Sequence, residues 1–348
     1  MSYTPTIYRH HGGILMAILA LLVAGLWVAN LFVGSVSIPS AEVWNILWGG
    51  NASVESWQYI VIESRIPQAV TALLAGAALA VAGLLLQTAF NNPLAGPSIL
   101  GIDTGASLGV AVVMLASNML HIANGMSGGI AAVGGAFVGA TAIMAVILFF
   151  STFVRDNLML LIIGIMVGYL ASSLISLLNF FATSQQVHAY TMWGLGNLGN
   201  ITLQQLPLFA TLSLTGLLIS ILLIKPLNAM LLGTRYAENL GINIKTTRNL
   251  LLLSTGLLTA TVTAYCGPVA FIGLSVPHIA RLLLQSSNHN SLLPVTMLCG
   301  AAVLLLCNLV STLPSGGIIP INAVTPVIGA PVIIYVIVNQ RKINYFNG

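Results

Sequence analysis

Charged residues are scarce in this sequence of 348 residues. Only 5% of the chain is Asp, Glu, Lys or Arg, with six acidic and ten basic side chains, whereas about 25% is usual for a soluble domain. A soluble fold of this size needs a charged surface to stay dissolved, and these side chains are too few to cover it. The scarcity of charge therefore excludes a soluble enzyme, a nucleic-acid-binding protein and a disordered chain.

Residues that hold metals or form disulfides are also few. The three cysteines, Cys266, Cys299 and Cys307, lie in apolar stretches, and an odd number gives no disulfide framework. The six histidines are scattered, without a pair at i and i+4 and without a carboxylate placed to complete a metal site. We therefore expect this chain to bind no metal ion or cofactor itself.

One glycine-rich segment has the spacing of a dinucleotide-binding loop. Gly194, Gly196 and Gly199 spell GxGxxG, but no predicted strand precedes them and no acidic residue stands about 20 positions later. The segment is therefore predicted to be an external turn. Because the sequence also lacks a Walker motif, we do not expect this chain to hydrolyse ATP or to be an enzyme.

Long apolar runs make up most of the chain, which is 57% hydrophobic. A membrane-spanning helix needs about 20 mainly apolar residues. The first run is longer than the apolar region of a signal peptide and lacks a clear cleavage site, so it is predicted to be a span. The sequence thus predicts an all-α, polytopic membrane protein with about ten transmembrane helices in a single domain, 1–348. The predicted spans are 14–34, 66–89, 94–117, 127–151, 158–181, 205–224, 249–266, 274–286, 293–313 and 321–338.

Basic residues gather on one side of these spans. Nine of the ten Lys and Arg residues fall there, four of them within 225–248, and Arg65 is the exception. Because positively charged loops are retained in the cytoplasm, this side is predicted to be cytoplasmic. An even number of spans then leaves both termini in the cytoplasm, with 182–204 as an external segment.

Glycines recur at a spacing that lets helix backbones approach closely in lipid. We expect these glycines to be packing positions within one compact bundle rather than contacts to a substrate. The motifs are Gly101-xxx-Gly105-xxx-Gly109, Gly135-xxx-Gly139 and Gly164-xxx-Gly168.

Asp103 is the one clear ionisable residue in the middle of an apolar span. Such groups are costly in a membrane and usually functional. Asp103 is predicted either to face a cavity or to be a protonated or backbone-bonded carboxyl at a helix break, and both interpretations stay open. An ion-coupled carrier or channel, the alternative function, usually needs more than one such group. We therefore expect the driving energy for transport to enter from another chain.

A series of short motifs identifies a family. In their order and spacing they resemble the FecCD permease family, the membrane subunits of type II ABC importers for iron–siderophore complexes, haem and vitamin B12. The resemblance covers about residues 14–340. The motifs are Arg65-Ile-Pro67, Gly76 to Gly83 with Gln87, Asn92 to Pro97, Gly267 to Leu274, Pro277-His278 with Arg281, and Ile328 to Pro331.

The resemblance implies a BtuC-like ABC permease fold in the bacterial cytoplasmic membrane. It also implies the partners: a second permease copy, two ATP-binding subunits that use ATP and Mg, and a periplasmic or lipid-anchored substrate-binding protein. The cargo would be a metal chelate, with an iron–siderophore or haem favoured and cobalamin also open. In such permeases a cytoplasmic loop, here 225–248, docks into the ATPase. The implied coupling residues are Arg235, Tyr236, Ala237, Glu238, Leu240 and Gly241.

The resemblance also implies a cytoplasmic gate, a docking surface and a translocation path. Arg65 and Gln68 match positions that dock the binding protein, although an arginine stands at the second position in B12-type members. Further departures are Thr312 at the third arginine position, Ile318 for a glutamate and Asn322 for a glycine, so docking is expected to rely less on charge. The implied gate residues are Asn91, Asn92, Pro93, Asn157 and Leu158. The candidate path residues are Met159, Met166, Asn179, Trp193, Asn197 and Asp103.

Overall fold

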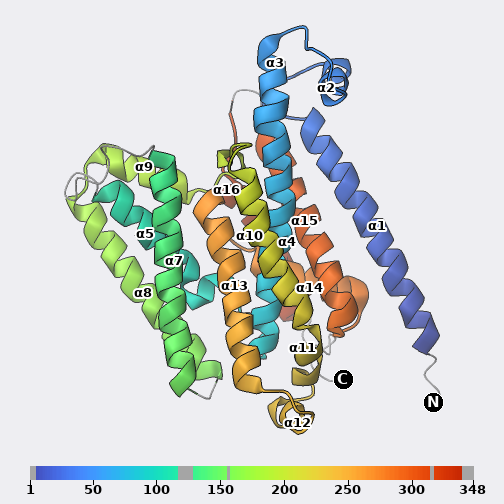
Figure 1. The fold of residues 1–348 in the computed structure, drawn as a ribbon, viewed down its shortest axis with the longest axis vertical. Coiled ribbons are helices and arrows are strands. Elements are labelled where there is room, and N and C mark those ends of the chain that lie inside the picture. Colours follow the sequence, from blue (N-terminus) through green and yellow to red (C-terminus); the bar gives the residue numbers. More distant parts are fainter. Residues whose placement is uncertain (1–4, 117–127, 155–156, 314–316, 339–348) are drawn as a thin grey trace.

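Helices carry nearly all of the regular structure in the computed structural model, which describes residues 5–116, 128–154, 157–313 and 317–338 (Figure 1). No strand occurs in these ranges, so the predicted all-α class is confirmed. Apolar runs fold as helices because a bilayer offers no water to an unpaired backbone group. The longest helices are α1 (Pro5–Phe32), α4 (Ile66–Ala89), α7 (Gly128–Phe153), α8 (Asn157–Phe181), α10 (Leu206–Leu222), α13 (Ile244–Cys266), α15 (His289–Thr312) and α16 (Ile321–Val338).

The ten predicted spans all correspond to apolar helices in the described part of the chain. Six of these helices are long and apolar enough to cross a membrane, and α10 forms a seventh span together with α11 (Ile224–Met230), at a bend of 50°. The other three are the shorter apolar helices α5 (Ile102–Leu115), α14 (Ile272–Leu284) and α16.

Some predicted boundaries were wrong. The first helix begins at Pro5 rather than at residue 14. The third predicted span, 94–117, begins as a turn and the 3₁₀ helix η2 (Pro97–Leu100), because its prolines cannot join an α-helical hydrogen-bond ladder. The remaining short elements are α2 (Ser40–Leu47), α3 (Glu55–Tyr59), the π-helix η1 (Ile60–Arg65), α9 (Ser184–Gly194), the 3₁₀ helix η3 (Leu198–Asn200) and α12 (Thr234–Asn239).

The helix α4 forms the centre of the bundle. It continues α3 and η1 into a 35-residue helical stretch, and 89% of its most apolar window is buried. Glycines set how closely its neighbours approach: a Cβ at Gly76 would lie 2.2 Å from the carbonyl oxygen of Gly300, and a Cβ at Gly83 only 1.6 Å from that of Gly273. α4 is therefore in backbone contact with α15 and α14.

The predicted glycine packing is confirmed between α5 and its neighbours. A Cβ at Gly109 would lie 1.8 Å from the carbonyl oxygen of Gly135, and one at Gly139 would lie 2.0 Å from that of Gly105. Such a close approach gains dispersion contacts where lipid supplies no hydrophobic drive for helix association. Gly101 likewise lies against α8.

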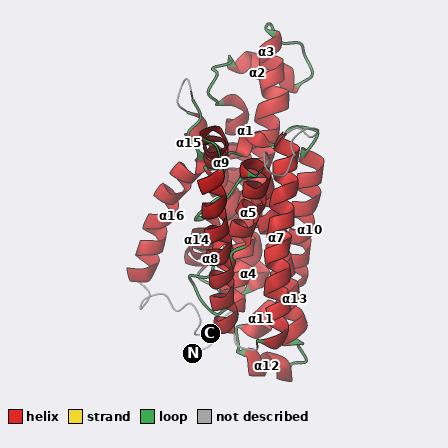
Figure 2. Cartoon of the chain, turned by 90° about the vertical axis from the view of Figure 1, so that its left-hand side faces the viewer, coloured by secondary structure: helices red, strands yellow, loops and turns green. Residues whose placement is uncertain are grey.

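The two ends of the bundle differ. α2 and α3 form a projection at one end, with α9 at the same end, while α12 lies at the opposite end (Figures 1 and 2). A separate small apolar cluster of Ile38, Val43, Ile46 and Val61 holds this projection together. The start of α1 lies toward the end that carries α12 (Figure 1). The segments 182–204 and 225–248 thus lie at opposite ends.

Candidate functional site

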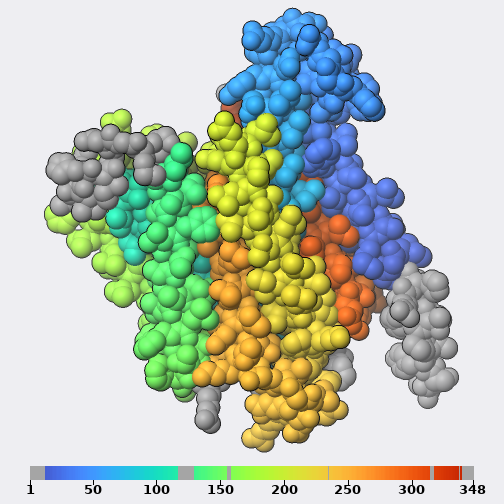
Figure 3. Space-filling view, in the orientation of Figure 1, coloured from blue at the N-terminus to red at the C-terminus, as the bar shows by residue number. Residues whose placement is uncertain are grey.

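The residues predicted to couple to an ATPase lie together on an exposed structure at one end of the molecule (Figures 1 and 3). Glycines with positive φ stand on both sides of α12, Gly233 at 100° and Gly241 at 82°, a conformation that lets the chain turn sharply. Ala237 is fully buried, whereas Tyr236 and Leu240 are more than half exposed. Residues 235–241, here called the coupling segment, thus present an aromatic and apolar surface outward.

The predicted gate residues Asn91, Asn92 and Pro93 form the turn after α4, here called the gate turn. Asn91 has a φ of +46°, a left-handed conformation that asparagine tolerates. Oδ1 of Asn92 accepts a hydrogen bond from the backbone N–H of Leu94 at 2.9 Å. In the second predicted gate element, the side chain of Leu158 is 55% exposed near the start of α8, and the Asn157 side chain lies outside the described part.

Buried polar side chains of α14 hold the gate turn. Nε2 of His278 donates to the carbonyl oxygen of Pro93 at 2.8 Å, and Nη1 of Arg281 donates to Oε1 of Gln87 at 2.6 Å. Gln87 in turn donates to the carbonyl oxygen of Leu274. Sequence reasoning used these residues only as family motifs and missed their role. The available signal was that a histidine and an arginine inside an apolar helix must find partners.

Asp103 lies at the start of α5 and is 9% exposed. Its carboxylate accepts hydrogen bonds from Oγ of Ser98 at 2.8 Å and Oγ1 of Thr263 at 2.7 Å, which join η2 and α13 to α5. It also lines a cavity of about 210 Å³ beside Phe271, a non-glycine residue with a φ of +67°. Both interpretations of Asp103 therefore have support: a bonded carboxyl at a helix break that also borders a cavity.

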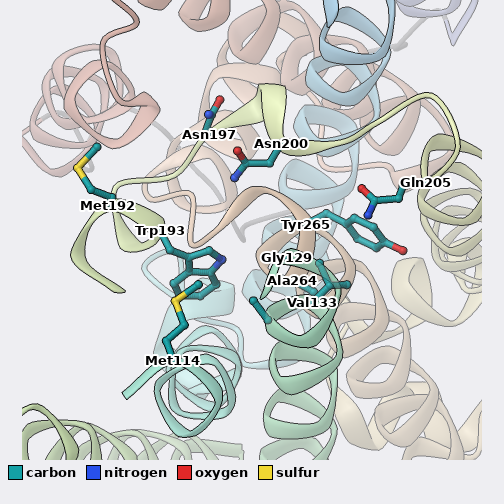
Figure 4. Close-up of a pocket in the computed structure, with 11 residues that line it drawn as sticks. Met114, Gly129, Val133, Met192, Trp193, Asn197, Asn200, Gln205, Ala264 and Tyr265 are labelled. Atoms are coloured by element: carbon teal, nitrogen blue, oxygen red, sulfur yellow. The ribbon is translucent and has the colours of Figure 1, made fainter. Parts of the chain in front are cut away.

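Trp193 and Asn197 border a pocket of about 410 Å³ at the end of the molecule that carries α9 (Figure 4). Met114 and Tyr265 contribute apolar surface to it, and the amides of Asn197, Asn200 and Gln205 add polar groups without charge. The glycine-rich segment runs through this region as a turn followed by η3, with no strand before it, as expected.

The candidate path residues on α8 do not share one face. Met159 and Met166 are 58% and 53% exposed and stand seven residues apart, so they lie on the same side of the helix. Asn179 is 13 positions after Met166 in the sequence, which rotates it roughly 140° away from that face. The three residues therefore cannot line a single path along α8.

The two predicted docking residues are buried. Arg65 is 5% exposed, and its guanidinium donates to the carbonyl oxygens of Leu31 and Phe32, each at 2.9 Å, at the end of α1. Gln68 is 8% exposed and donates to Oδ1 of Asn308 at 3.0 Å. In this conformation both side chains join helices, and Arg65 offers almost no charge to a partner's surface.

Asn322, a departure from the family pattern, has a structural role that sequence reasoning missed. Its Oδ1 accepts from the backbone N–H of Ala270 at 2.9 Å, and its Nδ2 donates to the carbonyl oxygens of Pro268 at 2.6 Å and Gly194 at 3.3 Å. One side chain on α16 thus ties together the loop after α13 and the end of α9. A glycine could make none of these bonds.

Metal-binding side chains do not cluster in the described residues: no group of three or more His, Cys, Asp or Glu lies close enough to hold an ion. What the bundle offers instead is apolar helices, glycine contacts, amide-lined turns and an exposed short helix at one end. These features define an integral membrane transport protein with a soluble partner at that end rather than a membrane enzyme.

The chain belongs to the FecCD transport family, whose sequence model matches residues 19–339. It is 32% identical to the hemin transport system permease protein HmuU of Yersinia pestis, over 95% of this chain and 96% of that protein. It is 34% identical to the vitamin B12 import system permease protein BtuC of Klebsiella pneumoniae, over 91% and 93%. It is 31% identical to YvrB, an ABC transporter permease protein of Bacillus subtilis, over 90% of each chain.

A solved structure has the same fold. It is described as an inward-facing conformation of a metal-chelate type ABC transporter, with a TM-score of 0.80, 29% identity, and coverage of 94% of this chain and 98% of that one. The predicted BtuC-like fold, the predicted family and the function of an ABC importer permease are therefore confirmed.

Proposed function

We propose that this chain carries a metal chelate into the bacterial cytoplasm as the membrane subunit of an ABC importer, with ATP and Mg used by a separate ATPase chain. The carrying observation is the match along nearly the whole chain to permeases named for hemin and vitamin B12 and to a metal-chelate type transporter. An iron–siderophore or haem is the favoured cargo, and cobalamin is the further candidate. A large chelate suits a wall of methionine and amide side chains with few charges.

The coupling segment is our candidate contact for the ATP-binding subunits. Arg235 and Glu238 are exposed on α12 beside the exposed side chains of Tyr236 and Leu240. This mixture of an aromatic ring, an aliphatic group and two charges is typical of a protein-binding surface. Ala237 and Gly241 fix the shape of the segment.

We place the coupling segment in the cytoplasm and both termini with it. The support is charge: nine of the ten basic residues fall on the predicted cytoplasmic side, as expected for positively charged loops. The projection formed by α2 and α3 then faces the periplasm. It carries Glu42, Glu55 and Glu63 and, between residues 33 and 64, no Lys or Arg.

We propose that the cargo passes between two copies of this chain, beside α8. Support comes from the exposed apolar face of α8 that includes Met159 and Met166. Trp193 and Asn197 are candidates for its external end. Asn179 is a weaker candidate, since it faces elsewhere on the helix, and Asp103 would contribute through the cavity that it borders.

The gate is proposed to lie at the gate turn and the start of α8. Amide side chains there can close by hydrogen bonds without leaving a fixed charge that would hold a passing chelate. For docking of the binding protein we retain Arg65 and Gln68 as the sequence candidates. Because both are buried, a docking role requires them to act by shaping the external surface or to become exposed when the partner binds.

Reconstitution tests the proposed function. The chain, its ATP-binding subunits and its binding protein are placed in vesicles, and uptake of haemin, cyanocobalamin and a ferric hydroxamate siderophore is measured with and without ATP. We expect ATP-dependent uptake of at least one of these chelates. Uptake by this chain alone, driven by a proton gradient, would instead establish an ion-coupled carrier.

A further inference from the structure

Three hydrogen-bonded side chains join α11 to the end of α4. Oδ1 of Asn228, on α11, accepts from the backbone N–H of His289 at 2.8 Å and lies 3.1 Å from Nδ1 of the same residue. On the far edge of that imidazole, Nε2 lies 3.0 Å from Oγ1 of Thr88. His289 and Thr88 are 1% and 6% exposed, so water does not compete strongly for these bonds.

The partners of His289 fix the proton on its ring. The backbone N–H of His289 needs an acceptor, so Asn228 must present its amide oxygen rather than its nitrogen. Because an amide oxygen only accepts, Nδ1 carries the proton and donates to it. In the neutral ring Nε2 is then an acceptor for the hydroxyl proton of Thr88, which Thr88 can share with the carbonyl oxygen of Leu84 at 3.0 Å.

A second contact strengthens the attachment of α11. Nδ2 of Asn228 donates at 3.1 Å to Oδ1 of Asn288, and the same oxygen accepts from the backbone N–H of Asn290 and so caps the first turn of α15. Asn228 therefore uses both its oxygen and its nitrogen to hold the start of α15. The end of α11 and the start of α15 should move together.

Each end of this chain of bonds leads to a proposed functional element. α11 ends at Met230, and only residues 231–233 separate it from α12. At the other end, the backbone N–H of Asn91 in the gate turn donates to the carbonyl oxygen of Thr88 at 3.3 Å. The side-chain bonds at Gln87 and Pro93 run to α14 instead.

We propose that Asn228, His289 and Thr88 are positioning residues that carry a displacement of the coupling segment to the gate turn. The inference rests on the proposed function, in which the coupling segment moves with the ATPase. Buried polar groups that part without new partners lose free energy. The three side chains therefore tend to move as a unit, and two packed arrangements of such a unit can couple distant sites.

Two threonines provide a matched pair of variants. The hydroxyls of Thr88 and Thr296 are both buried, and each lies within hydrogen-bond distance of the carbonyl oxygen four residues earlier, that of Leu84 or Leu292. Only Thr88 also bonds His289. Thr88→Val therefore removes the proposed link, whereas Thr296→Val changes the same atoms on α15 without it. Thr88→Ser restores the hydroxyl.

The experiment uses the complete transporter in vesicles, with Asn92→Cys as a reporter in the gate turn. Labelling by a membrane-impermeant maleimide is measured with and without ATP, beside the ATPase rate, and the chain without the reporter gives the background from native cysteines. In Thr88→Val and Asn228→Ala we expect the ATP-dependent change in labelling to fall about fivefold while the ATPase rate stays within about twofold. Thr88→Ser and Thr296→Val should keep the full change.

The outcomes separate this link from the proposed function. A full ATP-dependent change in both Thr88→Val and Asn228→Ala overturns the link and leaves the proposed function intact. Equal losses of labelling response and ATPase rate in Thr88→Val and Thr88→Ser also overturn it, because Thr88 would then serve stability alone. No ATP-dependent change in the reporter chain itself contradicts the proposed function, and the link falls with it.

Discussion

Arg281 and Gln87 form a buried pair: Nη1 of the arginine donates to Oε1 of the glutamine at 2.6 Å, although the two residues stand 194 positions apart in the sequence. Arg281 is 7% exposed and Gln87 is fully buried. The printed partner of this buried cation is thus a neutral amide, which also binds the backbone of α14 through Leu274. The pair holds the cytoplasm-facing end of α4 against α14.

Replacement of this glutamine tests how much the pair contributes to stability. Gln87→Ala removes an acceptor from a buried guanidinium and a donor from the Leu274 carbonyl, so we expect a loss of about 3 kcal/mol. The midpoint of thermal unfolding in detergent measures it. Gln185→Ala, at an exposed glutamine of α9, is the control and should leave the midpoint unchanged. Equal midpoints for both variants would contradict a stabilising role for the pair.

The close contact of α4 with α14 predicts that Gly83 tolerates no side chain. A Cβ there would lie 1.6 Å from the carbonyl oxygen of Gly273, so Gly83→Ala must push the helices apart, at a cost of about 3 kcal/mol or more. We expect little folded protein in membranes. Gly134→Ala on α7 meets no atom within 4 Å and should accumulate normally, as judged by size-exclusion chromatography. Normal folding of Gly83→Ala would show that the helices lie further apart.

The coupling segment can be tested by reversing one charge. Glu238→Lys, or deletion of 235–241, should abolish ATP-driven uptake while the chain still inserts into the membrane, because the exposed surface offered to the ATPase changes and the bundle does not. Glu55→Lys reverses a charge at the opposite end and should leave ATP hydrolysis unaffected. The measurements are uptake and copurification of the ATP-binding subunits. Normal uptake by Glu238→Lys would exclude this contact.

Arg65 allows the docking and structural roles to be separated. Arg65→Glu sets a carboxylate against the carbonyl oxygens at the end of α1, so we expect a loss of about 3 kcal/mol in stability and weaker binding of the substrate-binding protein. Unfolding midpoint and binding affinity are measured together. Glu63→Arg changes charge at an exposed position nearby and should leave the midpoint unchanged. Unaltered affinity in Arg65→Glu would remove Arg65 from the docking surface.

The external projection contains a carboxylate that gives a pH dependence. Side-chain and backbone hydrogen bonds from Ser53 lower the pKa of Glu42 from its ordinary value of 4.5. A lowered pKa in the folded state adds stability above about pH 4.5 that is lost as the pH falls through the folded value. Ser53→Ala should therefore lower the unfolding midpoint at pH 7 and match the unmodified chain well below pH 4. A constant difference at all pH values would contradict this assignment.

Much of the fold could be predicted because the signals are local. Each span is an apolar run of sufficient length, and the spacing of Gly105, Gly109, Gly135 and Gly139 foretold the contact between α5 and α7 that the structure contains. Boundaries failed where local signals were mixed, as at the prolines before α5. Helical periodicity could already have placed Asn179 away from Met159 and Met166.

The sequence by itself determined the class of protein, its ten apolar helices and the end at which basic residues gather, since a bilayer imposes the same requirement on each segment separately. Only the tertiary structure decided which polar side chains meet. Thr88 and His289 stand 201 positions apart, and Arg65 bonds to the end of α1 rather than remaining on the surface. Such pairs depend on how the helices pack, because a buried polar group takes whichever partner the neighbouring helix presents.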